Sequence, residues 1–154
     1  SKEPVCKQLI RAFEKFNLPV VAAHQMPKEE IHKYGSLKVN HISDNLFMCT
    51  DMVEKPTPDK VLSLYSILGR YILTPDIFDL LEVTPVGTGG EIQLTDALKV
   101  LSHQKGVVTV DFEGKRYDMG NKFGAMQACV EFALKHPEIS NQFKEYIREL
   151  VKKL

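Results

Sequence analysis

Helix-like and strand-like segments alternate along this chain, beginning with an amphipathic segment over residues 4–16 that leads directly into a short apolar run over residues 19–23. Apolar side chains recur in the first segment at intervals of three and four, which predicts a helix with one buried face. The second segment is β-branched at its centre and too short for a helix, so it predicts a buried strand. A helix that runs directly into a buried strand predicts an α/β fold.

A β-hairpin is also expected. Two strand-like stretches, residues 37–42 and 46–53, are separated by Ser43-Asp44-Asn45, and these residues favour a turn. The other expected elements are a short polar helix over residues 28–33, a strand over 64–73 that Gly69 interrupts, helices from residue 75 and over 93–103, a strand over 107–112, and helices over 123–134 and 139–154. Because no repeat or internal boundary is evident, residues 1–154 are expected to form a single domain that ends in a helical segment.

Local residues indicate where two of these helices begin or end. Thr74, Pro75 and Asp76 form a helix start, with a capping hydroxyl, a proline at the first position and an acid in the first turn. Gly35 is expected to end the helix over residues 28–33, because glycine takes the left-handed conformation without strain.

Charge balance and cysteine content exclude several classes of protein. Twenty Lys and Arg residues balance 20 Asp and Glu residues, so neither nucleic acid nor an anionic membrane is an expected partner. The 3 cysteines are widely spaced, which predicts neither a disulfide framework nor a zinc site and favours a reducing cytoplasm. Every apolar stretch is far shorter than the roughly 20 residues of a membrane-spanning helix, and the first residues have no signal core.

An acid and a base, Glu54 and Lys55, come directly after the strand expected over residues 46–53, and Pro56 takes the chain out of regular pairing. Ligands bind at strand tips in α/β sheets. A carboxylate accepts hydrogen bonds from neighbouring sugar hydroxyls, and an ammonium group neutralises phosphate oxygens. The alternative is a solvated Glu/Lys pair on a loop.

A glycine-rich loop over residues 87–90 precedes the helix expected over residues 93–103. Its amides could face an anion at the helix start, although Glu91 stands where a P-loop would have its Gly-Lys ending, and a plain connecting loop is the alternative. Thr95 and Asp96 lie inside the expected helix, where local hydrogen bonding or an exposed face would explain them.

Asp118 lies just before the helix expected from residue 123. An acid in this place could hold Mg²⁺ through one oxygen, while water and phosphate supply the other ligands, or it could cap the helix that begins near Asn121. The histidines have no zinc-like spacing and are expected to be structural or surface residues: His24, His32, His41, His103 and His136.

Five motifs occur in an order that resembles one enzyme family. They are Tyr34-Gly35, VEKP over residues 53–56, GRYIL over 69–73, GTGGEIQLTDAL over 87–98 and YDMGNKFGAMQA over 117–128. Over nearly its whole length the chain resembles the C-terminal half of bacterial UTP–glucose-1-phosphate uridylyltransferases. EIQLTDA with a downstream GNK is specific to this family, whereas EKP and YG are shared with glucose-1-phosphate thymidylyltransferases.

This resemblance implies a mixed β-sheet flanked by helices, as part of a nucleotide-diphospho-sugar transferase (Rossmann-like) fold. It also implies a nucleotidyltransferase whose small-molecule partners are glucose 1-phosphate, UTP and UDP-glucose, and which is a homo-oligomer when intact. Glucose 1-phosphate would attack the α-phosphorus of UTP, with no covalent enzyme intermediate. The products would be UDP-glucose and pyrophosphate.

Five positions match site residues of the family or of the related thymidylyltransferases. The resemblance assigns substrate binding to Tyr34, Gly35, Glu54 and Lys55, with Glu54 on the sugar hydroxyls and Lys55 on the phosphates. Gly35 would let the backbone approach the sugar. In the related thymidylyltransferases an aspartate in a D-x-G element binds Mg²⁺, and this aspartate would match Asp118. Lys55 would be the catalytic residue and, with the metal, would carry most of the catalysis.

Two parts of the family pattern have no counterpart in these residues. The glycine-rich G-x-G-T-R loop that binds the triphosphate and the acidic metal-binding element just upstream of this region are missing, so the chain is expected to be a fragment that is inactive alone. Two alternatives stay open at this point: a thymidylyltransferase-like enzyme, and a noncatalytic interaction or oligomerisation module.

Overall fold

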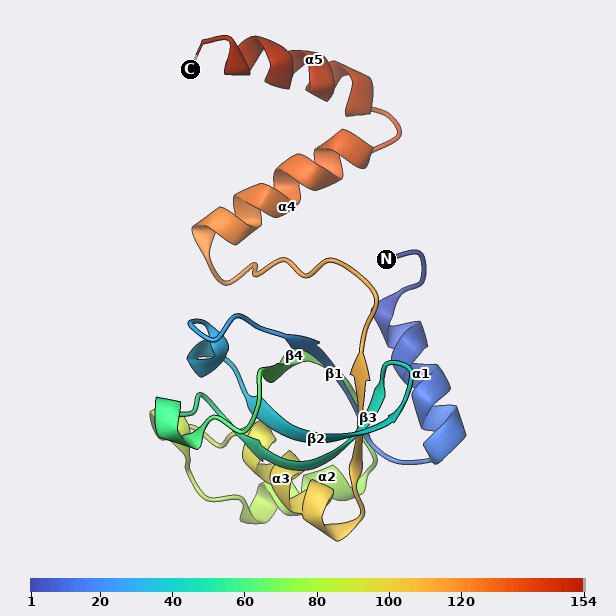
Figure 1. Ribbon diagram of the computed structural model, residues 1–154, viewed down its shortest axis with the longest axis vertical. Coiled ribbons are helices and arrows are strands. Elements are labelled where there is room, and N and C mark those ends of the chain that lie inside the picture. The colour runs from blue at the N-terminus through green and yellow to red at the C-terminus, as the bar shows by residue number, and fades with distance from the viewer. Residues whose placement is uncertain (154) are drawn as a thin grey trace. The chain divides into compact units, whose positions relative to one another are not determined.

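The computed structural model describes residues 1–153 and divides them into two compact units (Figure 1). The first, called here the sheet unit, is Ser1–Gly114. The second, the helical unit, begins at Lys115. The expectation of one domain over residues 1–154 stays a prediction.

The sheet unit contains a mixed β-sheet, as the sequence predicted. Its strands are β1 (Val20–Gln25), β2 (Ser36–Ser43), β3 (Leu46–Val53), β4 (Tyr65–Ile72) and β5 (Val107–Asp111). Strand β1 pairs parallel with β5 and antiparallel with β4, while β3 pairs antiparallel with both β5 and β2. The β2–β3 pair is the expected hairpin, with Asp44 at a φ of 45° in its turn. Ser36 at the start of β2 also pairs with Ser66 of β4.

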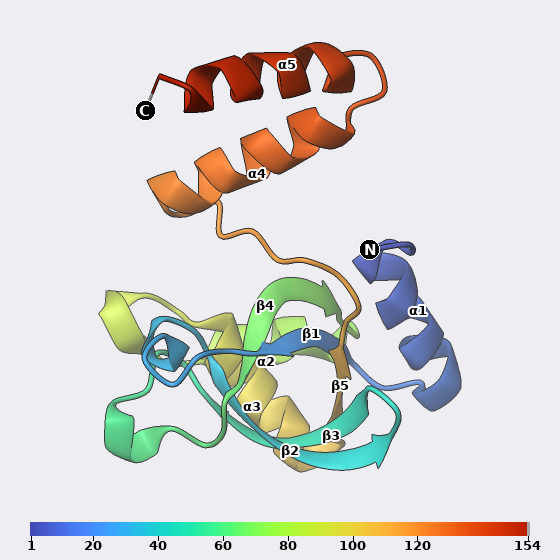
Figure 2. The ribbon, with the colours of Figure 1, turned by 45° about the horizontal axis from the view of Figure 1, so that its top comes forward.

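Alternation along β1 places side chains on two faces of this sheet. Val20 and Ala22 belong to one buried cluster, together with residues of helix α1 (Val5–Phe16). Val21 and Ala23 belong to a second buried cluster, together with residues of helices α2 (Asp76–Val83) and α3 (Leu94–Gln104). Figure 2 shows α1 and α3 on different sides of the sheet. The sheet is therefore covered by helices on both faces, as an α/β fold requires.

Two local expectations about helix ends were wrong. Residues 28–33 form only the short 3₁₀ helix η1 (Ile31–Lys33), and Gly35 is not left-handed because Tyr34 is already extended, at φ −132° and ψ 171°, and leads into β2. Helix α2 begins as predicted, but the Thr74 hydroxyl donates to the Asp76 carboxylate and caps no backbone amide. The remaining 3₁₀ helices are η2 (Pro58–Lys60) and η3 (Thr88–Gly90).

Gly69 interrupts β4 as expected. Its φ of 61° lies in the left-handed region, which favours glycine. Opposite it, Val21 pairs with Tyr71 and Ala23 with Ile67, so the register shifts between these pairs. The glycine therefore marks an irregularity in the β1–β4 ladder.

The helical unit contains helices α4 (Lys122–Lys135) and α5 (Ser140–Val151), both predicted from the sequence. The Asn121 side chain caps α4 by accepting a hydrogen bond of 2.7 Å from the Gly124 amide. Over residues 1–153, no helix is long and apolar enough to cross a membrane.

Candidate functional site

The carboxylate of Glu54 is held by a neighbour from a distant part of the sequence. Glu54 comes directly after β3, and helix α3 packs against this strand. Thr95, in the first turn of α3, donates a hydrogen bond of 2.6 Å from its hydroxyl to Glu54 Oε2. Thr95 is buried and Glu54 half-buried, so this contact is largely shielded from solvent.

Gly35 lies against the same carboxylate. A Cβ atom at this position would be 3.0 Å from Glu54 Oε2 and 3.6 Å from the side chain of Thr95. Such a distance is tighter than an ordinary van der Waals contact, so a side chain here would displace the carboxylate. Since its φ is not positive, Gly35 serves to leave space and not to form a turn.

A backbone hydrogen bond joins the Tyr34-Gly35 segment to Glu54-Lys55. The Lys55 amide donates to the Tyr34 carbonyl at 3.1 Å. Lys55 has a φ of 43°, a left-handed conformation that costs a non-glycine residue about 1 kcal/mol or more. Its side chain is exposed. Residues with strained backbones occur often at functional sites. The conformation of Lys55 therefore supports a role in ligand binding, which its exposure alone does not indicate.

Tyr71 of β4 lies close enough to Glu54 for the negative charge to affect the pKa of its phenol. Burial and, after it, the negative charge of Glu54 raise the pKa of the Tyr71 phenol above its ordinary value. The four expected substrate-binding residues thus lie together, with Tyr71 and Thr95 around them. The expectation of local hydrogen bonding or an exposed face for Thr95 was wrong, because this residue is buried and its hydroxyl donates to Glu54. Tyr71 was not expected in the site, although it lies in one of the motifs that carry the resemblance.

The glycine-rich loop is closed on itself. Within it, the Gly87 amide donates to the Glu91 carbonyl at 2.9 Å, and the Gly90 amide donates to the Gly87 carbonyl at 3.1 Å. A Cβ atom on Gly87 would be 2.5 Å from Asp96 Oδ2, so a side chain at this position would require Asp96 to move. Two of the amides that could face an anion are therefore engaged, and the geometry favours the connecting-loop interpretation.

Asp118 lies in the helical unit. Its Oδ1 accepts a hydrogen bond of 2.9 Å from the Gly120 amide, and its Oδ2 is 3.5 Å from the Arg116 guanidinium. The alternative of a helix cap was wrong, because Asn121 caps α4. In residues 1–153, no three His, Cys, Asp or Glu side chains gather as a metal site. A single carboxylate can bind Mg²⁺ when water molecules and phosphate oxygens supply the remaining ligands. Asp118 fits this kind of site.

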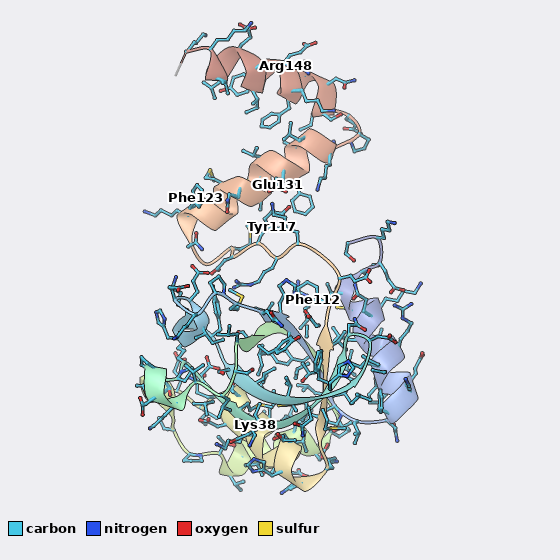
Figure 3. All side chains as sticks on the ribbon, viewed as in Figure 1. Lys38, Phe112, Tyr117, Phe123, Glu131 and Arg148 are labelled. Atoms are coloured by element: carbon cyan, nitrogen blue, oxygen red, sulfur yellow. The ribbon has the colours of Figure 1, made fainter. Side chains whose placement is uncertain are left out.

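A second polar group in the helical unit joins its first residues to α4. Tyr117 and Glu131, both labelled in Figure 3, form a hydrogen bond of 2.8 Å from the phenol to Oε2. Lys115 forms an ion pair with the other carboxylate oxygen of Glu131. These contacts lower the pKa of Glu131, the Lys115 hydrogen bond most, and raise those of Lys115 and Tyr117.

His24 and Asp111 form a pair that the sequence did not suggest. They lie at the carboxyl ends of the parallel strands β1 and β5, and His24 Nδ1 is 2.7 Å from Asp111 Oδ1. The ring of His24 also lies 5.5 Å from that of Phe112. The signal that could have found this pair is that each residue stands near the end of a predicted strand, where a parallel sheet brings polar side chains together.

Comparison with known proteins agrees with the motifs. No protein-family model matches the chain. The UTP–glucose-1-phosphate uridylyltransferase of Streptococcus pneumoniae is 40% identical over 152 residues, which are 98% of this chain and 51% of that protein. Over nearly its whole length the chain is similar to about half of this bacterial enzyme. The predicted resemblance is therefore confirmed, and the chain spans about half the length of the curated relatives it matches.

Solved structures of UDP-glucose pyrophosphorylases share the fold of this chain. A UDP-glucose pyrophosphorylase complexed with UDP-glucose matches 84% of this chain and 49% of its own, with a TM-score of 0.81 and 37% identity. The enzyme from Acinetobacter baumannii matches 94% of this chain and 50% of its own, with a TM-score of 0.82 and 30% identity. The predicted nucleotidyltransferase fold is confirmed.

Proposed function

We propose that this chain forms the sugar-phosphate side of an enzyme that transfers the uridylyl group of UTP to glucose 1-phosphate. A phosphate oxygen of glucose 1-phosphate forms a bond to the α-phosphorus of UTP, and the bond from that phosphorus to the bridging β-phosphate oxygen breaks. The products are UDP-glucose and pyrophosphate. The relatives that match the whole chain at about 40% identity carry this activity in their name.

The observation that carries the proposal is the cluster of Gly35, Glu54 and Lys55 at the end of β3. Glu54 is fixed at 2.6 Å by Thr95, and its remaining lone pairs can accept hydrogen bonds from sugar hydroxyls. Lys55, next in sequence and exposed, can neutralise phosphate oxygens as charge moves to the leaving pyrophosphate. Positioning and charge neutralisation are the main needs of a phosphoryl displacement, so Lys55 is the proposed catalytic residue.

Asp118 is the proposed Mg²⁺ contact. One of its oxygens accepts a hydrogen bond from the Gly120 amide, and this contact orients the side chain. Carboxylate oxygens are ligands that Mg²⁺ prefers. When bound, the ion would neutralise phosphate charge. Homo-oligomer formation, a cytoplasmic location and inactivity of this chain alone stay predictions.

Affinity for UDP-glucose tests the proposal. Glu54→Gln and Lys55→Ala are expected to weaken binding of UDP-glucose to this chain roughly tenfold each, because each removes a charged hydrogen-bonding partner. Lys60→Ala is the control, since Lys60 is also an exposed lysine beyond β3 and has no proposed role. Isothermal titration calorimetry measures all three. Equal affinities in Lys55→Ala and Lys60→Ala, or no binding by the unchanged chain, would contradict the proposal.

A further inference from the structure

The hydroxyl of Thr95 is directed at Glu54 and not at its own helix. A threonine inside a helix commonly donates to the carbonyl four residues earlier. For Thr95 that residue is Glu91, which precedes α3, and the hydroxyl donates instead to Glu54 Oε2 at 2.6 Å. Thr95 is only 7% exposed, so the donor has little access to water.

Residue 35, which lies against the Glu54 carboxylate, has no side chain that could contact it. Gly35 presents bare backbone to Oε2, at a place where a Cβ atom would be only 3.0 Å away. An ionised carboxylate offers about four acceptor positions, of which Thr95 uses one. The carboxylate is therefore oriented while most of its acceptor capacity remains for a ligand.

We propose that Thr95 is a positioning residue, which holds the Glu54 carboxylate in the orientation that accepts the hydroxyl groups of a hexose 1-phosphate. This inference rests on the proposed function, because it takes the sugar as the ligand of Glu54. A glutamate side chain that is already ordered loses less rotamer freedom on binding. Removal of the hydroxyl is therefore expected to weaken hexose phosphate binding roughly tenfold.

A structural role at the α3–β3 contact is the competing explanation. In that case the shape of residue 95 would matter and its hydroxyl would not. Thr95→Val keeps the shape and removes the hydroxyl, whereas Thr95→Ser keeps the hydroxyl and removes a methyl group. The two variants therefore give opposite results under the two explanations.

The test is a titration of the chain and its variants with glucose 1-phosphate, followed by NMR. Thr95→Val is expected to bind roughly tenfold more weakly than the unchanged chain, and Thr95→Ser within about twofold of it. Inorganic phosphate, as a second probe, is expected to bind all three alike, because it carries no sugar hydroxyl. If Thr95→Val does not fold, as judged by its amide spectrum, Thr95→Ala takes its place.

Two further variants show that the effect passes through Glu54. Thr95→Val combined with Glu54→Gln is expected to bind no more weakly than Glu54→Gln alone, since the contact is already altered. Ser102→Ala is the matched control: Ser102 lies on the same helix and is equally buried, but its hydroxyl donates to the Lys99 carbonyl. It is expected to bind as the unchanged chain does.

Each failure has its own pattern. If the unchanged chain binds no glucose 1-phosphate, the proposed function fails and this inference fails with it. If the unchanged chain binds and Thr95→Val binds equally well, only the positioning role is overturned. It is also overturned if Thr95→Ser loses as much affinity as Thr95→Val, or if the Thr95→Val and Glu54→Gln effects simply add.

Discussion

The sheet unit and the helical unit differ in how much apolar surface they bury. In the sheet unit, Leu9, Leu98 and Val108 are completely buried between the sheet and its helices. Among the described residues of the helical unit, the buried ones are small, Gly124 and Ala128. The first unit is stabilised by a core, and the second depends on capping and polar contacts. The candidate sugar site lies on the unit whose core can hold it rigid.

The cysteines give the largest expected difference between the units. Burial raises the pKa of the Cys49 thiol in β3 to about 12, while Cys129 of the helical unit is exposed. Because only the thiolate reacts, a rise of about three pKa units slows alkylation of Cys49 roughly 1000-fold. Mass spectrometry after treatment with iodoacetamide at pH 8 measures this. Equal labelling of Cys49 and Cys129 in the folded chain would show that the sheet unit is not closely packed.

Truncation of one apolar side chain in each unit is the next comparison. Leu98→Ala is expected to lower the free energy of unfolding of the sheet unit by about 2–5 kcal/mol, because it leaves a cavity in the core. Phe123→Ala, at a side chain that is 73% exposed in the helical unit, is expected to change stability by about 0.5 kcal/mol or less. Hydrogen exchange of each unit in increasing urea measures both. Similar losses for the two variants would contradict the difference in packing.

The pH dependence of the helical unit tests its reliance on polar contacts. The pKa of Glu131 is depressed in the folded state, chiefly by the Lys115 hydrogen bond and then by Tyr117. Its contribution to stability is therefore present above the unfolded pKa and is lost as pH falls through the folded pKa. Glu131→Gln is expected to speed hydrogen exchange in α4 at pH 6, and the difference is expected to vanish in strong acid.

Glu138→Gln is the control for that experiment, since Glu138 is an exposed acid between α4 and α5. It is expected to leave exchange in α4 unchanged. A Glu131→Gln effect that persists undiminished at pH 2 would mean that the carboxylate charge does not stabilise the unit.

The smallest expected effect concerns Tyr71 in the sheet unit. Burial is the larger cause of its raised pKa and the charge of Glu54 the smaller. Glu54→Gln is therefore expected to lower the pKa of Tyr71 only part of the way to its ordinary value. NMR of ¹³C-labelled tyrosine measures the shift, with Glu29→Gln, an exposed acid before η1, as the control. No change in Glu54→Gln would place the carboxylate farther from the phenol than the structure does.

Much of the fold was predictable because local patterns and tertiary packing agree. The β2–β3 hairpin, the Gly69 interruption and the last two helices follow from apolar periodicity and turn residues alone. The Gly35 prediction failed because a glycine can be needed for turn geometry or for space, and only the packed structure shows which.

The candidate site was predictable only in part. Glu54 and Lys55 stand out because they are adjacent and end a strand. The contact of Thr95 with Glu54 joins residues 41 positions apart, and no spacing rule indicates it. The same limit applies to His24 and Asp111, which meet only because β1 and β5 are parallel neighbours.

The most direct test of the central claim is an NMR titration of the isotopically labelled chain with UDP-glucose and Mg²⁺, beside a titration with UTP and Mg²⁺. The account predicts that UDP-glucose shifts the amides of Gly35, Glu54 and Lys55, and that UTP shifts them weakly or not at all. An absence of shifts at these three residues with UDP-glucose, in a folded sample, would contradict a sugar-phosphate site on the sheet unit.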